Sequence, residues 1–313
     1  MATKPYLSVV VPVKDEVQSL LPFWRNLSTV LKSIGKSFEV IFVDDGSSDG
    51  SFGKLTAIAR QYPMVNVVKF QGNFGKSAAL QAGFDHANGE VIATLDADLQ
   101  DEPTELPKLL KKLNEGYDLV SGWKQDRQDP VSKIIASKVF NGITSSLTGV
   151  RFHDFNSGFK VYRRAVVDEL QLYGELHRFI PVFAARNHFK VAEVPVKHNP
   201  RIFGKTKYGI ERLLRGFFDL ITVVFLTGYL KRPSHFFGGI GLLFLIAGLA
   251  INGYITYIRL TTGSIQFRLP LLFLGVLLVI VGIQSITTGL LAEMLTHLGA
   301  EQKKPYIVER VVR

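Results

Sequence analysis

The stretch VIATLDADLQDEP, residues 91–103, joins an apolar run directly to a group of carboxylates. The run has the length and the β-branched, apolar character of a buried strand, and Asp96 and Asp98 follow it at once. Two carboxylates at the end of a buried strand are costly to desolvate unless a positive group binds there. The stretch therefore predicts a strand that ends at a binding site, with Asp101 and Glu102 as ordinary turn and helix-start residues.

Similar short runs alternate with helical patterns through the first two hundred residues. Strands are predicted at residues 7–13, 38–43, 65–70, 90–95, 119–121, 159–162 and 190–196, and helices at 17–33, 51–61, 76–87 and 104–114. This alternation predicts an α/β fold, with a mostly parallel sheet covered by helices on both faces. Ligands collect at the carboxyl ends of such strands, which is where both acidic motifs, Asp44-Asp45 and Asp96/Asp98, fall.

The composition separates the chain into a polar first part and an apolar second part. The 313 residues carry a net charge of +10 and include no cysteine, which excludes disulfides and thiolate metal sites. The basic residues gather at 197–232 and after 303, on either side of the apolar segments. This distribution favours anionic lipid head groups as the partner and argues against nucleic acid. The N-terminus lacks the pattern of a signal peptide, so the first domain is expected to stay in the cytosol.

Two apolar segments, residues 236–258 and 269–291, contain no charge and exceed the roughly 20 residues that cross a bilayer. The alternative, two buried core helices, is disfavoured because little of the chain remains to cover them. Basic residues lie mainly outside the pair, which predicts a multi-pass protein of the cytoplasmic membrane with both termini in the cytosol. Glycines and polar residues in the segments favour helix association, and hence a homo-oligomer such as a tetramer.

The segment YGIERLLRGFFDLITVVFLTGYL, residues 208–230, precedes the first apolar segment. Its apolar residues recur at helical spacing, with charged residues largely on the other faces, which predicts an amphipathic helix in the membrane interface. A helix that packs on the soluble domain is the alternative.

The D-x-D pattern at Asp96 and Asp98 supplies hard oxygen ligands, which suit Mg²⁺ or Mn²⁺ bound together with substrate phosphates. Alone the pattern is weak, because solvated turn acids explain it equally well. Three further motifs stand near predicted strand or helix ends: VVPVKDE at 10–16, VDDGSSDGS at 43–51 and NFGKSAALQAG at 73–83. The last contains Lys76 at a predicted helix start, which is a reasonable place for an anion.

Taken in this order, the four motifs resemble the family 2 glycosyltransferases, which have a GT-A nucleotide-sugar fold. DFNSGFKVYRR at 154–164, RIFGKTKYG at 201–209 and the apolar pair narrow the resemblance to the polyprenyl-phosphate sugar synthases. The resemblance covers the whole chain. It implies a cytosolic GT-A catalytic domain at 1–200, a juxtamembrane segment at 201–235, a transmembrane hairpin at 236–292 and a cytosolic tail at 293–313.

The resemblance also implies roles for individual residues. Pro12, Val13, Glu16 and Asp45 would hold the nucleoside, although Lys14 and Asp15 depart from the usual Tyr and Asn and leave the choice of base in doubt. Asp96, Asp98 and Gln100 would hold the metal and the diphosphate. Phosphate contacts would come from Lys124, Lys133 and Ser137, with Arg127 as a further basic candidate. Near the membrane, Arg201 and Lys207 would gather the donor and acceptor phosphates; a general anionic-lipid patch is the alternative for this pair.

The implied reaction is an inverting, metal-dependent transfer of a sugar from a nucleotide sugar to a polyprenyl phosphate. The acceptor phosphate is already mostly dianionic at neutral pH, so no strong general base is needed, and Asp154 would orient the acceptor or the basic residues. UDP-glucose and undecaprenyl phosphate are the expected substrates, with GDP-mannose or a UDP-aminosugar as alternative donors. A processive polysaccharide synthase is disfavoured because the chain lacks a Q-x-x-R-W motif and such enzymes usually have more membrane spans. A catalytically silent lipid- or nucleotide-sugar-binding protein is the remaining alternative.

Overall fold

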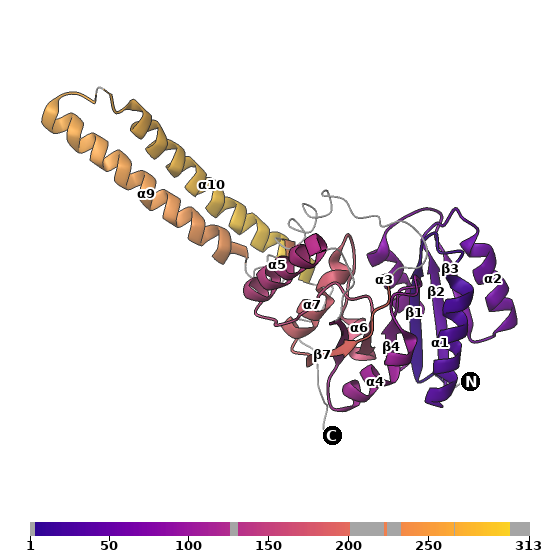
Figure 1. Ribbon diagram of the computed structural model, residues 1–313. Helices are drawn as coiled ribbons and strands as arrows, with labels where there is room; N and C mark the ends of the chain where they lie inside the picture. Colours follow the sequence, from indigo (N-terminus) through magenta and orange to yellow (C-terminus); the bar gives the residue numbers. More distant parts are fainter. Residues whose placement is uncertain (1–3, 126–130, 201–221, 224–232, 266, 301–313) are drawn as a thin grey trace, which may run out of the picture. The chain divides into compact units, whose positions relative to one another are not determined.

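The computed structural model describes residues 4–125, 131–200, 222–223, 233–265 and 267–300. The chain forms two compact units, Met1–Val223 and Val224–Arg313, each with its own internal packing. The first contains the sheet, and the second contains two long helices (Figure 1).

A seven-stranded sheet, ordered β3-β2-β1-β4-β6-β5-β7, forms the centre of the first unit. All neighbouring strands run parallel except β6, which is antiparallel to both β4 and β5. The mostly parallel α/β fold predicted from the sequence is confirmed, with strand ends shifted by at most three residues. The strands are β1 (Leu7–Val13), β2 (Phe38–Asp44), β3 (Val65–Lys69), β4 (Val91–Thr94), β5 (Leu119–Lys124), β6 (Lys160–Arg163) and β7 (Val191–Val196).

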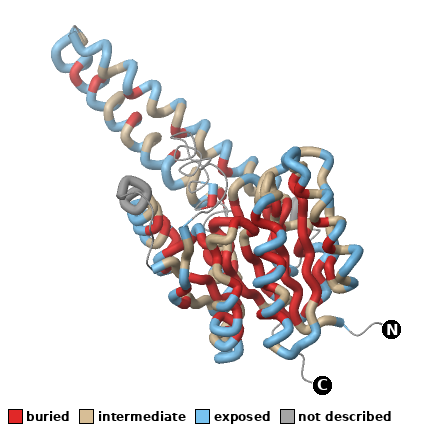
Figure 2. The backbone as a smooth tube through the Cα atoms, turned by 45° about the vertical axis from the view of Figure 1, so that its right-hand side comes forward, coloured by how far each residue is buried: buried red, intermediate tan, exposed pale blue. Residues whose placement is uncertain are grey.

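Helices cover both faces of this sheet, and the strand interiors are buried (Figure 2). On one face, α1 buries Phe23, Trp24 and Leu27 in the i, i+3, i+4 pattern of an amphipathic helix. The opposite face packs against α3, α6 and α7, with Tyr162 of β6 in its core. The helices of this unit are α1 (Leu20–Ile34), α2 (Ser51–Gln61), α3 (Lys76–His86), α4 (Leu106–Asn114), α5 (Val131–Thr148), α6 (Arg164–Asp168) and α7 (Ile180–Arg186), with 3-10 turns η1 (Pro103–Glu105) and η2 (Leu176–Phe179).

The second unit is an antiparallel pair of helices, α9 (Pro233–Thr262) and α10 (Leu269–Ala300). Their most apolar stretches have mean hydropathies of 2.0 and 2.5, and only 11% of each is buried. Both helices are therefore long and apolar enough to cross a membrane, and they contain the two segments predicted to do so. Such low burial does not fit core helices of a soluble protein. Helix α10 continues to Ala300, so the predicted tail at 293–313 begins inside a helix.

Glycines bring α9 and α10 into close contact. A Cβ atom on Gly248 would lie 2.7 Å from the carbonyl oxygen of Gly275, and one on Gly241 would lie 2.6 Å from that of Gly282. The glycines thus recur every seven residues on each helix, where only a hydrogen atom fits between the backbones. Gly241 and Gly248 therefore allow α9 to pack closely against α10.

Replacing Gly248 with leucine is expected to separate the two helices, because the added side chain meets backbone atoms of α10 at less than 3 Å. The change can be measured as a longer and broader distance distribution between spin labels at Leu249 and Leu274, which are both exposed. Gly253→Leu serves as the control, since nothing lies within 4 Å of a Cβ atom there. An unchanged distance in the Gly248 variant would contradict this packing.

Candidate active site

The loops after β1 and β2 are tied together at the carboxyl edge of the sheet. The Lys14 ammonium donates to the carbonyl oxygen of Gly46 at 2.6 Å, and the Asp15 amide donates to Ser47 Oγ at 2.9 Å. The Asp15 carboxylate in turn accepts the Ser48 amide at 2.8 Å. Two of the sequence motifs, 10–16 and 43–51, therefore form one continuous wall of the site.

The departure from the family pattern at Asp15 has a backbone explanation. Asp15 has a φ of 55°, in the left-handed region where asparagine and aspartate are the best-tolerated residues after glycine. Its carboxylate also fixes the next loop through Ser48. Asp15 can thus fill the backbone role of the usual asparagine.

The Asp45 carboxylate lies at the end of β2 and holds the loop that leads into α3. Its Oδ1 accepts the Phe74 amide at 2.6 Å, and its Oδ2 accepts the Gly75 amide at 3.0 Å. Asp45 is buried and already has these backbone partners, so its expected contact with a nucleoside stays a prediction. The other residues expected to hold the nucleoside, Pro12, Val13 and Glu16, lie along β1 and just beyond it.

Lys76, at the start of α3, forms an ion pair with Asp96 at the end of β4. Its Nζ atom lies 2.5 and 2.8 Å from the two carboxylate oxygens. Asp96 also lies against Gly158, since a Cβ atom on that glycine would be 2.4 Å from Asp96 Oδ2. The segment before β6 therefore leaves room for the acid only because residue 158 has no side chain.

Replacing Gly158 with alanine is expected to displace the Asp96 carboxylate and to lower sugar transfer by roughly ten-fold or more, because a 1 Å displacement at a reaction centre is costly. Activity and thermal midpoint would be measured together. Gly53→Ala is the matched control: nothing lies within 4 Å of its Cβ position in α2, and alanine favours a helix there. Full activity in the Gly158 variant would mean that the position of Asp96 is unimportant.

Asp98 and Gln100 complete the turn after β4. Asp98 is largely buried, and its Oδ1 accepts the Gln100 amide at 3.2 Å. Among the described residues, no group of three or more His, Cys, Asp or Glu side chains forms a closed metal cage. Two carboxylates and one amide instead fit Mg²⁺ or Mn²⁺, which keep waters and take substrate phosphate oxygens as their remaining ligands. The Lys76 ammonium lies against the Asp96 carboxylate, so a positive charge is already favoured at this position.

The interpretation of Asp101 as an ordinary turn residue is wrong. Asp101 is only 1% exposed, and its Oδ1 lies 3.1 Å from the Lys124 ammonium and 3.8 Å from His198 Nδ1. Burial raises the pKa of Asp101, but the Lys124 charge and the nearby His198 ring outweigh it and hold the pKa below its ordinary value. Glu102 does precede the 3-10 turn η1, as expected, and it also accepts the Asn199 side-chain amide at 2.9 Å.

Asp154 lies buried in the loop after α5, where neighbouring side chains fix its position. Glu193 of β7 accepts the backbone amides of His153 and Asp154 at 2.8 and 3.0 Å. From α5, the Asn141 amide group donates to the His153 carbonyl oxygen at 2.6 Å and lies 3.5 Å from Ser137 Oγ. The structure thus brings Ser137 near the loop of Asp154, as expected if both serve one site.

Lys160, at the start of β6, is a buried cation that the sequence analysis did not single out. It is 3% exposed, and its ammonium donates to the Ser157 carbonyl oxygen. Burial and the Lys76 charge lower the pKa of Lys160, while Asp154 and Asp96 raise it, and the balance leaves the pKa at about 8. Lys160 therefore interacts electrostatically with both Asp96 and Asp154. The sequence contained one indication of this role: Lys160 lies in a predicted strand, and lysines are almost never fully buried unless they are paired.

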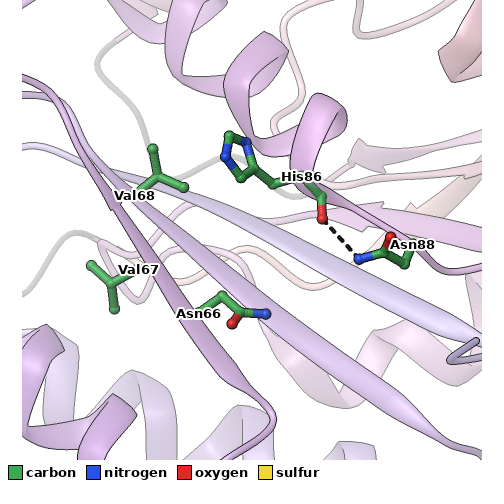
Figure 3. Close-up of a pocket in the computed structure, with 5 residues that line it drawn as sticks. All are labelled: Asn66, Val67, Val68, His86 and Asn88. Carbon is green, nitrogen blue, oxygen red and sulfur yellow. Dashed lines mark hydrogen bonds between the residues drawn. The ribbon is translucent and has the colours of Figure 1, made fainter. Parts of the chain in front are cut away.

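A pocket elsewhere on the first unit does not coincide with the expected site. An open pocket of about 470 Å³ is lined by Asn66, Val67, Val68, His86 and Asn88, at the edge strand β3 and the end of α3 (Figure 3). It contains none of the expected site residues.

Several expected site residues cannot be placed. Arg127, Arg201 and Lys207 lie outside the described residues, as does most of the predicted amphipathic helix, and the side chain of Lys133 is not described.

Solved structures with a similar fold include complexes of a glucosyl-3-phosphoglycerate synthase. Glucosyl-3-phosphoglycerate synthase from Mycobacterium tuberculosis, bound to UDP, aligns with a TM-score of 0.53 over 72% of this chain and 80% of its own, at 18% identity. Its complex with Mn²⁺ and UDP-glucose aligns equally well, at 19% identity and 79% of that chain. At these identities the likeness establishes the fold only.

Sequence comparison gives the family. The model of glycosyl transferase family 2 matches residues 8–171. Dodecaprenyl-phosphate galacturonate synthase from Rhizobium johnstonii is 36% identical over 312 residues, which cover 97% of this chain and 92% of the relative. The chain therefore belongs to glycosyltransferase family 2, in its polyprenyl-phosphate sugar synthase group.

Proposed function

We propose that this enzyme transfers a sugar from a nucleotide sugar to a polyprenyl phosphate, with Mg²⁺ or Mn²⁺ at Asp96, Asp98 and Gln100. The observation that carries the proposal is the acidic turn at the carboxyl edge of the sheet, beside Lys76, in a chain related along almost its whole length to such a synthase. A divalent ion bound there would neutralise the diphosphate as it leaves.

In the proposed reaction, an acceptor phosphate oxygen attacks the anomeric carbon of the sugar. The bond from that carbon to the nucleoside diphosphate breaks, and its electron pair leaves with the diphosphate, so the anomeric centre inverts. The acceptor needs no proton removed, since a phosphate monoester is mostly dianionic at neutral pH. Asp154 therefore serves to orient the acceptor or the basic residues.

The remaining obstacle is repulsion between two anionic substrates. Basic side chains would reduce it by screening and positioning the phosphates, which is most effective when the charges are held in place beforehand. Lys133, Ser137, Arg201 and Lys207 are proposed for the acceptor side, and Lys76 and Arg127 for the donor side, where the family resemblance also implies Lys124.

Two donors are proposed. UDP-glucose is the expectation from the sequence. UDP-galacturonate is the second candidate, favoured by the name of the relative, which specifies galacturonate. The acceptor is proposed to be undecaprenyl phosphate or a similar bacterial polyprenyl phosphate. The catalytic domain and both termini are proposed to lie on the cytosolic side of the cytoplasmic membrane, in a homo-oligomer.

The test is a donor panel with purified full-length enzyme in detergent and undecaprenyl phosphate. Radiolabelled UDP-glucose, UDP-galacturonate, GDP-mannose and a UDP-aminosugar would be compared for label in the organic extract, with Mg²⁺, with Mn²⁺ and with EDTA. Metal-dependent labelling from one donor is the expected result. Nucleotide-sugar binding without labelled lipid from any donor would favour the catalytically silent alternative.

A further inference from the structure

Asp101 joins three chain segments that are distant in the sequence. Besides the Lys124 ammonium of β5, its carboxylate faces His198, in the segment after β7, across an isolated antiparallel bridge between residues 101 and 198. All three side chains are nearly excluded from solvent, with exposures of 1%, 14% and 8%. Breaking a buried ion pair is costly, because it leaves the remaining partner buried as an unpaired charge.

The neighbouring residues reinforce the same connection. The Asn199 amide donates to the Gln100 carbonyl oxygen at 2.9 Å, and the Asn199 side chain donates to Glu102 at 2.9 Å. The Gln100 side-chain amide lies 3.5 Å from both His198 Nε2 and the Asn199 carbonyl oxygen. The turn that contains Asp98 and Gln100 is therefore held from the side by the segment after β7.

The pairing with Asp101 changes the role expected for Lys124. The family resemblance implies that Lys124 contacts substrate phosphates, yet its ammonium is buried against Asp101 at 3.1 Å. An ammonium held in this way is already engaged before any substrate arrives.

We propose that Asp101 is a positioning residue for the donor site: by pairing with Lys124 and facing His198, it fixes the turn that presents Asp98 and Gln100 to the metal and the diphosphate. Lys124 then acts mainly as the partner of Asp101. This inference rests on the proposed function, because it assigns a role within the same donor site.

The test compares Asp101→Asn, Lys124→Met and the double variant in the full-length enzyme. Asp101→Asn is expected to raise the donor KM and the Kd for Mn²⁺ in the presence of UDP, measured by electron paramagnetic resonance, by about ten-fold or more, because it loosens the turn and leaves a buried ammonium unpaired. Its kcat at saturating donor and metal, and its acceptor KM, are expected to stay within about three-fold of wild type. A loss of fold would instead reduce the active fraction without shifting KM.

The double variant separates the two roles of Lys124. If Lys124 is the partner of Asp101, removing both charges leaves no unpaired ion, and the double variant binds Mn²⁺ with UDP more tightly than Asp101→Asn alone. If Lys124 contacts the phosphates directly, the double variant is the weakest binder of all, and the inference is overturned. An unchanged KM and Kd in Asp101→Asn would overturn it as well. An absence of transfer by the wild-type enzyme with every donor would contradict the proposed function instead.

Discussion

Replacing Asp98 with asparagine is expected to lower sugar transfer by roughly a thousand-fold or more, with the fold intact. Asparagine keeps the size of the side chain and can still accept the Gln100 amide, so the turn after β4 should persist. What is lost is one negative charge toward a divalent ion, and metal stabilisation of a leaving group is worth several kcal/mol. Each 1.4 kcal/mol corresponds to a factor of ten in rate.

The measurement is initial-rate transfer with Mg²⁺ or Mn²⁺ varied up to saturation, alongside the thermal midpoint. Asp85→Asn is the matched control, because Asp85 is an exposed acid on α3 that only accepts a hydrogen bond from Gln81. Full transfer activity in the Asp98 variant, with the metal supplied, would rule out the proposed metal site. Restoration of activity by high metal concentration would instead show that Asp98 contributes affinity alone.

The sheet could be predicted from the sequence because its central strands are buried on both faces. β1 reads LSVVVPV and β2 reads FEVIFVD, almost without interruption by polar residues. Such runs bounded by turn residues are typical of parallel strands. What the runs could not reveal is the order of the strands, because pairing of β6 between β4 and β5 depends on contacts far apart in the sequence.

The candidate site was predictable where residues cluster in the sequence, as at Asp96 and Asp98. It was not predictable where partners are distant. Nothing local indicates that Asp101 pairs with Lys124, or that Glu193 holds the loop of Asp154. These contacts arise because several strands end at one edge of the sheet, so they follow from topology and not from spacing along the chain.

Replacing Lys160 with methionine is expected to make the catalytic unit more stable and the enzyme less active. Lys160 is buried, and burial together with the Lys76 charge lowers its pKa from an ordinary value of 10.5 to about 8. At pH 7 the protein therefore keeps a charge where a neutral group is preferred, at a cost of up to about 3 kcal/mol. Methionine removes that cost and fills similar space. It also removes a positive charge that interacts with Asp96 and Asp154, which should lower kcat by about ten- to a hundred-fold.

The pH dependence distinguishes this account from a simple gain in packing. Below about pH 8, Lys160 is protonated in both the folded and the unfolded chain, so the full cost is present. Between about pH 8 and 10.5, the folded protein releases the proton while the unfolded chain retains it, so the wild type gains stability as the pH rises. The methionine variant lacks this gain. Its advantage in thermal midpoint should therefore be largest near pH 7 and disappear toward pH 10.5.

Tryptophan fluorescence can follow this difference in the full-length protein without metal or nucleotide. Both tryptophans, Trp24 and Trp123, lie in the first unit, so their signal reports the unfolding of the sheet and not of α9 and α10. Lys160→Arg is the control that keeps the charge, and it should retain more activity than the methionine variant. A midpoint advantage that does not change with pH would show that methionine acts through packing alone. The buried ammonium would then have no measurable cost to stability. If activity were also unchanged, the interaction of Lys160 with Asp96 and Asp154 would have no role in catalysis.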